Sequence, residues 1–361
     1  MRRALVALMI LLALPPRASG QAVKSELTRL LEEDLATYPA KVGVYVKNLR
    51  TGEEAMVNAD QAFSSASVIK IPIMVRAFQL ADQKRLNLDE RVEIRRSEFR
   101  DGTGVFQFLD VGLRPTVKDL ITQMIITSDN TATDLMTTKI GGVDSLNAWL
   151  AASGYARTRM VNRGWEYRRK LLAVLNPDFA ILTAEETTGL QYAAQDSPLF
   201  ELYKPLFGGE REKWVALVRD PVSRKALVDA RTRLTVQDRS YWLGDMNPRE
   251  TGRLLEGIEL GASASTASSA TMKAVLSRQQ LGVRRIPHFL DVPVAHKTGD
   301  SPNIANDVGM VYARSGTIIV AFFANGITGQ YAETEDMIGR TSRKIIDYFD
   351  RAAASRAPLN R

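Results

Sequence analysis

Apolar residues follow two different periods along the chain. Residues 23–37 repeat apolar positions at the spacing of an amphipathic helix. The stretch KVGVYVKNL then alternates between apolar and polar residues, which predicts a strand, and TGE turns the chain into a short second strand at 55–57. From about residue 61 to residue 260 the spacing is mostly helical.

Strand patterns return near the C-terminus. The segments DVPVAHKTG, NDVGMVYAR and GTIIVAFFAN precede a final helix at about 333–353, and RSG joins the last two strands as a hairpin turn. Because strands lie at both ends of the chain, we expect an α+β fold, an α/β sandwich whose antiparallel sheet is flanked by helices. The predicted sheet domain comprises 23–60 and 261–361, the predicted helical domain is 61–260, and a site is expected between them.

Two segments of the helical domain carry helix-start signals. TAEE at 183–186 and NPRE at 247–250 are both capping boxes. Between them lies a charged, amphipathic stretch, from which we expect extra helices that form an insertion at about 190–245. Its apolar residues include Phe200, Phe207, Trp214 and Leu217. They predict either the core of this insertion or a surface for an unknown protein partner.

The composition limits the classes of function. The chain has 361 residues, no cysteine, two histidines and a formal net charge of +7. Lysines and arginines are interleaved with acidic residues, so we expect no nucleic-acid partner. A cysteine nucleophile is impossible, a His/Cys zinc site is not expected, and the P-loop, HExxH and GxSxG patterns are absent from the sequence. We expect no cofactor and no metal.

The N-terminal segment predicts export. MRRALVALMILLALPPRASGQA combines two arginines, an apolar run and small residues, which is typical of a signal peptide at 1–22 cleaved after Gly20 or Ala22. The apolar run from Ala4 to Leu14 is too short to span a bilayer. We therefore expect no stable membrane anchor after cleavage, and a periplasmic or secreted protein.

The segment FSSASVIKIPIM contains the first candidates for catalysis. Ser67 and Lys70 are three residues apart, so they share a face if the segment is helical. A serine nucleophile needs an adjacent base, and burial of a lysine favours its neutral form, so Lys70 could deprotonate Ser67. Pro72 indicates a helix that opens just before it, where backbone N–H groups would stabilise an oxyanion. Alone, this motif is more often a short polar patch on an ordinary helix.

The segment SDN at 128–130 follows an apolar helix. Ser128 could relay a proton to a leaving nitrogen, and Asn130 could hold a substrate amide. Asp129 is expected to brace the turn. The alternative interpretation is a simple helix cap followed by a new helix.

The segment KTG at 297–299 ends an apolar strand. Lys297 would supply positive potential for a substrate carboxylate, and Thr298 could hydrogen-bond the same group. Gly299 would let a ligand approach the backbone closely. Strand alternation places His296 on the opposite face, in a structural role.

The three motifs in this order resemble those of the class A β-lactamase family and its penicillin-binding relatives. The segments SASVIKIPIM, TSDNTATDLM, RIPHFLDVPVAHKTGD and NDVGMVYAR resemble longer stretches of that family. The resemblance covers most of the chain after residue 22, except about 190–245. It implies an exported serine β-lactamase, which opens a small-molecule β-lactam through an acyl-enzyme.

The same resemblance implies a role for each matching residue. Ser67 is the acylated nucleophile, and Lys70 assists its deprotonation. Ser128 and Lys297 help to protonate the departing nitrogen and to bind the substrate carboxylate. The backbone N–H groups of Ser67 and Asp300 form the oxyanion hole.

The resemblance is incomplete where the acyl group must be released. The family places a glutamate in a loop that typically reads E-x-x-L-N. The matching region here is VNRGWEYRRKLLAVLNPDF, so Glu166 is the predicted base, although Lys170 stands at the expected asparagine. We favour TAEE as the helix start after this loop. If NPRE is that start, the loop contains the insertion, and Asp238 or Asp245 could be the base.

Two other functions remain open. One is a penicillin-binding D,D-peptidase or related serine hydrolase with slow deacylation. The other is a non-catalytic binding or sensor protein on the same scaffold. The three motifs favour an enzyme, because a binding protein needs neither lysine.

Overall fold

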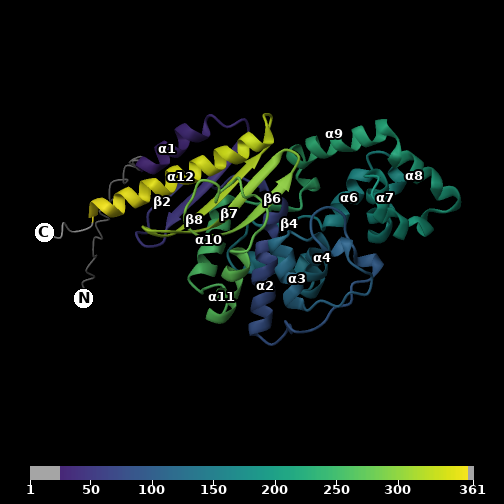
Figure 1. Ribbon diagram of the computed structural model, residues 1–361, viewed down its shortest axis with the longest axis horizontal. Coiled ribbons are helices and arrows are strands. Elements are labelled where there is room, and N and C mark those ends of the chain that lie inside the picture. Colours follow the sequence, from purple (N-terminus) through teal and green to yellow (C-terminus); the bar gives the residue numbers. More distant parts are fainter. Residues whose placement is uncertain (1–24, 357–361) are drawn as a thin grey trace, which may run out of the picture.

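The computed structural model describes residues 25–356, and the expected signal peptide at 1–22 lies outside them. Its main sheet has five antiparallel strands in the order β2-β1-β8-β7-β6, so both ends of the chain share one sheet (Figure 1). These strands are β1 (Lys41–Asn48), β2 (Glu54–Val57), β6 (Val294–Ser301), β7 (Ile304–Ala313) and β8 (Gly316–Asn325). The predicted α+β fold, with a sheet made from both ends of the chain, is confirmed.

Helices cover both faces of the sheet. Helices α1 (Glu26–Leu35) and α12 (Tyr331–Arg356) lie together on one face, over alternate strand residues such as Val44. Tyr45 points to the opposite face, where α10 (Pro248–Glu259) packs against β1 and β8. A Cβ atom at Gly252 would lie 2.2 Å from the Tyr45 ring, so this glycine allows α10 to approach the sheet.

Further helices continue from this second face in a single hydrophobic core. They are α2 (Lys70–Asp82), α3 (Val117–Ile126), α4 (Asn130–Lys139), α5 (Gly142–Ala152) and α11 (Thr266–Leu276). Helix α11, expected in the sheet domain, packs against α2 and α3 as well as β6. The core therefore crosses the boundary expected at residue 260, because apolar residues on both sides of it pack together. Among residues 25–356, no helix is both long and apolar enough to cross a membrane.

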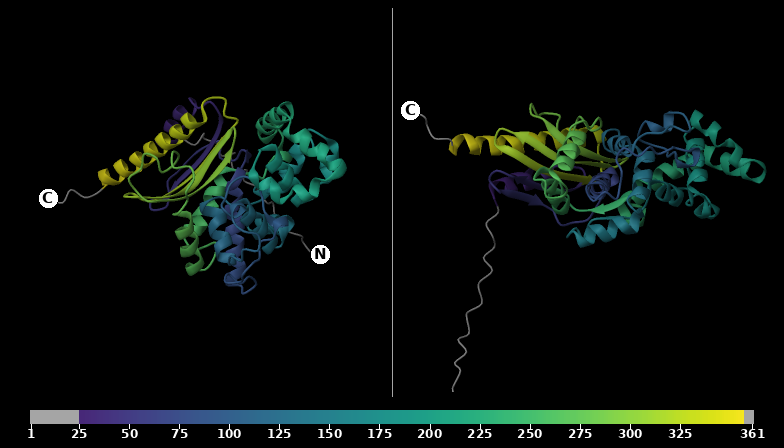
Figure 2. Two further views of the ribbon diagram at one scale, coloured as in Figure 1. Left: turned by 45° about the vertical axis from the view of Figure 1, so that its right-hand side comes forward. Right: turned by 90° about the horizontal axis from the view of Figure 1, so that it is seen from below.

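The extra helices form a separate lobe (Figure 2). The lobe contains α6 (Gly164–Leu172), α7 (Ala184–Ala194), α8 (Glu212–Arg219) and α9 (Pro221–Gln237). Its own core begins with Leu172 and Phe179, so the lobe starts earlier than the expected residue 190. The apolar residues considered for a partner surface belong to this core or pack against it: Phe200, Phe207, Trp214 and Leu217.

A small sheet marks where the chain enters and leaves the lobe. Its strands have the order β3 (Phe63–Ser64), β5 (Gly244–Met246) and β4 (Arg159–Met160). TAEE caps α7 inside the lobe, whereas Asn247 of NPRE caps α10, which packs on the main sheet. The preference for TAEE as the helix start after the loop is therefore wrong. A capping motif marks a helix start but does not determine where that helix packs.

Candidate active site

The predicted nucleophile lies where the chain passes from β3 into α2. A 3-10 helix, Ala66–Ile69, leads directly into α2, so Ser67 and Lys70 stand at a helix start as predicted. Ala66 has a φ of 43°, a strained left-handed conformation for a residue with a Cβ atom. Ser67 is half-buried and lines a pocket, whereas Lys70 is only 1% exposed.

Two lysines meet at the hydroxyl group of Ser128. Lys70 Nζ donates to Ser128 Oγ at 3.0 Å and to Asn130 Oδ1 at 3.0 Å. Lys297 Nζ donates to the same Ser128 Oγ at 3.2 Å. Strand β6, which carries Lys297, packs against the 3-10 helix that carries Ser67. The structure thus brings the three motifs together around one serine hydroxyl.

The environment lowers the pKa of both lysines. Burial lowers the pKa of Lys70 well below its usual value of 10.5, and the charge of Lys297 lowers it further. Burial also lowers the pKa of Lys297, to about 8. A neutral Lys70 can accept the proton of Ser67, while Lys297 remains protonated below about pH 8.

Asp129 and Asn130 hold the second motif in place. Asp129 accepts hydrogen bonds from the backbone N–H groups of Ala132 and Phe106, both at 2.9 Å, so it braces the turn as expected. Asn130 Nδ2 donates to the Asp101 carbonyl oxygen at 2.9 Å. This bond fixes the Asn130 amide in the wall of the pocket, where a substrate amide was expected to bind.

The third motif places one predicted binding residue away from the pocket. Thr298 is fully buried, and the amide group of Gln279 lies 3.1 Å from its Oγ1 atom. It points to the opposite face of β6 from Lys297, because neighbouring strand residues alternate. A Cβ atom at Gly299 would lie 2.4 Å from the Ser65 carbonyl oxygen. Gly299 thus allows β6 to approach the backbone just before Ser67.

Asp300 lines the pocket next to Ser67, as the predicted oxyanion hole requires. Its carboxylate is ion-paired with Arg285 and accepts a hydrogen bond from Tyr331 Oη at 3.1 Å. Burial raises the pKa of Asp300, but the charge and hydrogen bond of Arg285, the charge of Lys297 and the hydrogen bond of Tyr331 together hold this pKa below its usual value. The carboxylate therefore anchors β6 and remains ionised. The sequence did not point to Arg285, because Arg285 lies outside the three motifs and its distance from Asp300 along the chain matches none of them.

Glu166 does not line the pocket around Ser67. Its Oε2 atom accepts a hydrogen bond of 2.8 Å from the backbone N–H of Arg163 at the start of α6. The next two residues, Tyr167 and Arg168, line the pocket instead. A glutamate three residues after a helix start has the spacing of a capping residue, so its position in the sequence did not distinguish the two roles.

The two alternative bases also lie elsewhere. Asp238 caps a short 3-10 helix by accepting the backbone N–H of Ser240 at 2.8 Å. Asp245 lines a different pocket, near Arg159 and Arg239. Among the described residues, the carboxylates that line the Ser67 pocket are Asp101 and Asp300. Within residues 25–356, no cluster of three or more histidine or acidic side chains could hold a metal ion.

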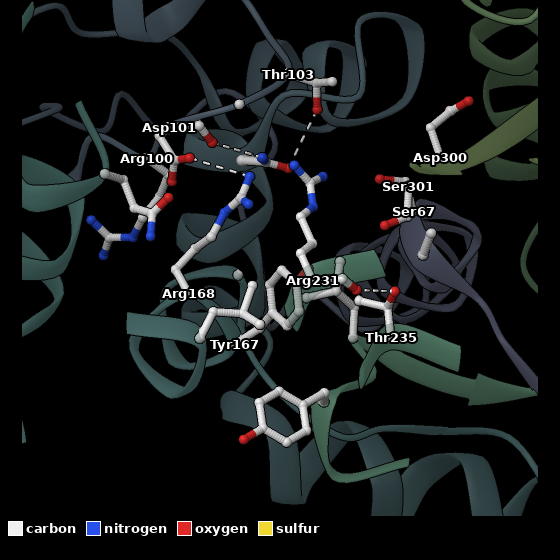
Figure 3. Close-up of a pocket in the computed structure, with 18 of the residues that line it drawn as sticks. Ser67, Arg100, Asp101, Thr103, Tyr167, Arg168, Arg231, Thr235, Asp300 and Ser301 are labelled. Atoms are coloured by element: carbon white, nitrogen blue, oxygen red, sulfur yellow. Dashed lines mark hydrogen bonds and ion pairs between the residues drawn. The ribbon is translucent and has the colours of Figure 1, made fainter. Parts of the chain in front are cut away.

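The pocket lies between the helical domain, the end of β6 and the lobe (Figure 3). It has a volume of about 350 Å³. Ser67, Ser128 and Asn130 line it together with lobe residues such as Tyr167 and Arg231. Sequence analysis missed these lobe residues, because only the packing of the lobe brings them close to Ser67.

Comparison with known proteins identifies the class. The model of the "Beta-lactamase enzyme family" matches residues 22–199 and 216–349, and the chain belongs to this family. β-Lactamase VEB-1 of Pseudomonas aeruginosa is 25% identical over 138 residues, 38% of this chain and 46% of the relative. A β-lactamase of Amycolatopsis lactamdurans is 30% identical over 142 residues, 39% of this chain and 44% of the relative. The chain thus spans less than half the length of these relatives.

Solved structures show the same fold over most of the chain. A β-lactamase of Sphaerobacter thermophilus aligns with a TM-score of 0.64 and 22% identity, covering 90% of this chain and 96% of that structure. The protein PBP-A aligns with a TM-score of 0.65 and 21% identity, covering 91% of this chain and 97% of that structure. At these identities the likeness concerns the fold alone.

Proposed function

We propose that this chain is a serine hydrolase of the β-lactamase family that forms an acyl-enzyme on Ser67 with β-lactam amides. The observation that carries the proposal is the Ser128 hydroxyl, which lies within hydrogen-bond distance of both Lys70 and Lys297. Burial and the charge of Lys297 hold the pKa of Lys70 well below its usual value, so Lys70 serves as the base, and Lys297, with a pKa of about 8, serves as the cation at neutral pH.

The proposed acylation uses these residues in sequence. Lys70 takes the proton of Ser67 as Ser67 Oγ attacks the amide carbonyl. The backbone N–H groups of Ser67 and Asp300 stabilise the oxyanion. When the C–N bond breaks, Ser128 gives its proton to the departing nitrogen and recovers one from Lys70. The product is an ester on Ser67 with the ring nitrogen protonated.

We further propose that release of the acyl group is slow. Glu166 is engaged at the start of its own helix, which removes the predicted base from the pocket. This observation favours a penicillin-binding type of function over rapid β-lactam turnover. A solved variant of PBP-A is described as an acyl-enzyme complex with penicillin G, so a protein of this fold can hold such an adduct.

Intact mass and turnover measured together test both parts of the proposal. We expect purified protein mixed with a chromogenic cephalosporin to gain the mass of one acyl group, with little turnover. The Ser67→Ala variant should gain no mass. Absence of any adduct and of turnover in the wild-type protein would refute acylation. Rapid turnover without a persistent adduct would refute slow release and support a β-lactamase.

Export is a separate proposal, based on the segment at 1–22. Expression of the full chain in a Gram-negative host should give a periplasmic protein whose mass corresponds to cleavage after Gly20 or Ala22. A full-length protein that remains in the cytoplasm would contradict it.

A further inference from the structure

The lobe gives the Ser67 pocket a cationic wall. Arg168 on α6 and Arg231 on α9 both line the pocket. Figure 3 shows the Arg231 side chain extending from α9 into the pocket toward Thr103, with Arg168 beside it. Neither arginine belongs to the three motifs that surround Ser128.

The arginines of this pocket differ in their partners. Arg168 Nη2 lies 3.2 Å from Asp101 Oδ2, Arg100 Nε lies 2.6 Å from Asp134 Oδ2, and Arg224 is ion-paired with Asp196. Arg231 makes no ion pair within residues 25–356, and its buried Nε atom has no hydrogen-bond partner there. Asp101 and Tyr167 offset part of its charge, but Arg231 is the arginine of the pocket wall without a carboxylate in direct contact.

The electrostatic environment of Arg231 favours an anion. Burial lowers its pKa, and the nearby charge of Arg168 lowers it further. A guanidinium group nevertheless stays protonated at neutral pH, so the repulsion between the two arginines and the cost of burying their charges both remain. A carboxylate bound between the two arginines would offset both effects and could accept two parallel hydrogen bonds.

The position of this wall relative to the catalytic groups is set by a short chain of contacts. Asn130 donates to the Asp101 carbonyl oxygen, and the Asp101 side chain pairs with Arg168. The wall therefore adjoins the side of the pocket where Asn130 would hold a substrate amide. Lys297 is expected to bind the carboxylate on the leaving-group side of the substrate. It contacts Ser128 from β6, so it belongs to a different element from the two arginines of the wall.

Helix α9 is also fixed against the sheet, which positions Arg231. Asn303, in the turn between β6 and β7, donates from Nδ2 to the Thr232 carbonyl oxygen at 2.6 Å. Thr235 Oγ1 donates to the Arg231 carbonyl oxygen at 2.6 Å. The arginine thus extends from a helix that is held at the edge of the pocket.

We propose that Arg231 and Arg168 form a second anion subsite, which binds a carboxylate carried by the acyl part of the substrate. This inference rests on the proposed acylation of Ser67 and names its substrate class: amides whose acyl group bears an additional carboxylate. The lobe then selects substrates by charge.

A matched pair of penicillins tests this subsite. Benzylpenicillin and α-carboxybenzylpenicillin differ only in one carboxylate on the acyl side chain. We expect the wild-type protein to acylate faster with the carboxylated compound, measured as second-order rate constants by intact mass. The ratio of the two constants should fall by roughly tenfold or more in Arg231→Gln, because a hydrogen-bonded charge pair is lost.

Control variants separate this effect from general damage. Arg231→Lys should retain part of the ratio, and Arg233→Gln, which removes an exposed charge from the same helix, should leave the ratio unchanged. In the wild-type protein, added NaCl should lower the ratio. A ratio that is the same in wild type and Arg231→Gln, or insensitive to NaCl, would overturn the subsite while leaving acylation intact.

Failure of the proposed function has a different signature. If neither penicillin acylates Ser67, calorimetry with phenylmalonate and phenylacetate, the free acids of the two side chains, tests the subsite directly. Tighter binding of phenylmalonate that is lost in Arg231→Gln would support the subsite without acylation. Binding of phenylmalonate that is undetectable in wild type, or unchanged in Arg231→Gln, would overturn it.

Discussion

The backbone N–H of Arg163 donates a hydrogen bond of 2.8 Å to Glu166 Oε2 at the start of α6. This contact engages the carboxylate predicted to activate water at the first turn of its own helix. Tyr167 and Arg168, the next two residues, line the Ser67 pocket instead. The groups proposed for acylation therefore meet around Ser128, whereas the glutamate predicted for release of the acyl group lies outside the Ser67 pocket.

Replacement of Glu166 should affect stability and leave deacylation unchanged. We expect Glu166→Ala to lower the free energy of unfolding by about 1 kcal/mol, since a helix-start contact is lost. Glu166→Gln keeps an acceptor at the same place and should cost less. The lifetime of the acyl-enzyme, followed by mass spectrometry, should match wild type in both variants. A longer acyl-enzyme lifetime in Glu166→Gln than in wild type would show that Glu166 is the base for deacylation.

The acylation rate should depend on pH through both lysines. Neutral Lys70 is needed as the base, so the rate constant should rise as Lys70 loses its proton. It should fall again above about pH 8, where Lys297 becomes neutral. In Lys297→Arg the fall should move to higher pH, because arginine stays charged. Acylation rate constants measured from pH 5 to pH 10 check this prediction. If the rate constant of Lys297→Arg falls above about pH 8 just as in wild type, the prediction is contradicted.

Stability should also record the lowered pKa of Lys297. Its pKa is 10.5 when unperturbed and about 8 in the folded protein, so between these values the unfolded chain binds more protons. The free energy of unfolding should therefore rise with pH in this window, by up to about 3 kcal/mol. Lys297→Met should lack this part of the rise, whereas Lys213→Met, at an exposed lysine, should retain it. If the free energy of unfolding rises with pH equally in wild type and in Lys297→Met between pH 8 and pH 10, the lowered pKa of Lys297 is disproved.

Because Ala66 has a left-handed φ, replacing it with glycine should stabilise the protein, whereas most substitutions by glycine destabilise one. Ala66 has a φ of 43°, where glycine has no steric penalty. We expect Ala66→Gly to raise the free energy of unfolding by about 1 kcal/mol. Ala77→Gly, inside α2, should instead lower it by about 1 kcal/mol or more. Equal losses in the two variants would show that the Ala66 backbone is not strained.

Asn303 should control how firmly the lobe is held over the pocket. In Asn303→Ala the hydrogen bond to the Thr232 carbonyl oxygen is lost, so amide exchange in α9 should become faster. The ratio of acylation by the two penicillins should also fall, since Arg231 loses its fixed position. Gln79→Ala removes a similar side-chain bond, to the Ser263 carbonyl oxygen, away from the lobe. If both variants change α9 exchange equally, Asn303 has no special role.

Several features were predictable because they depend on neighbouring residues. Alternation identified β1 and β7, and helical spacing identified α1 and α12. The three motifs were recognisable because each is a short segment of fixed local geometry. The lobe was expected as extra helices, but its start was placed too late, since α6 has the same helical pattern as the helices before it.

The sequence by itself determined the α+β fold, the family and the residues that surround Ser128. Helix spacing, strand alternation and motif order are local properties, and they persist wherever the segment packs. Only the tertiary structure decided that Glu166 is engaged at the start of α6 and that Thr298 faces away from the pocket. It also decided that Arg231 reaches the Ser67 pocket. These features depend on how distant segments pack, and the contact of α9 with the turn between β6 and β7 has no periodic signal along the chain.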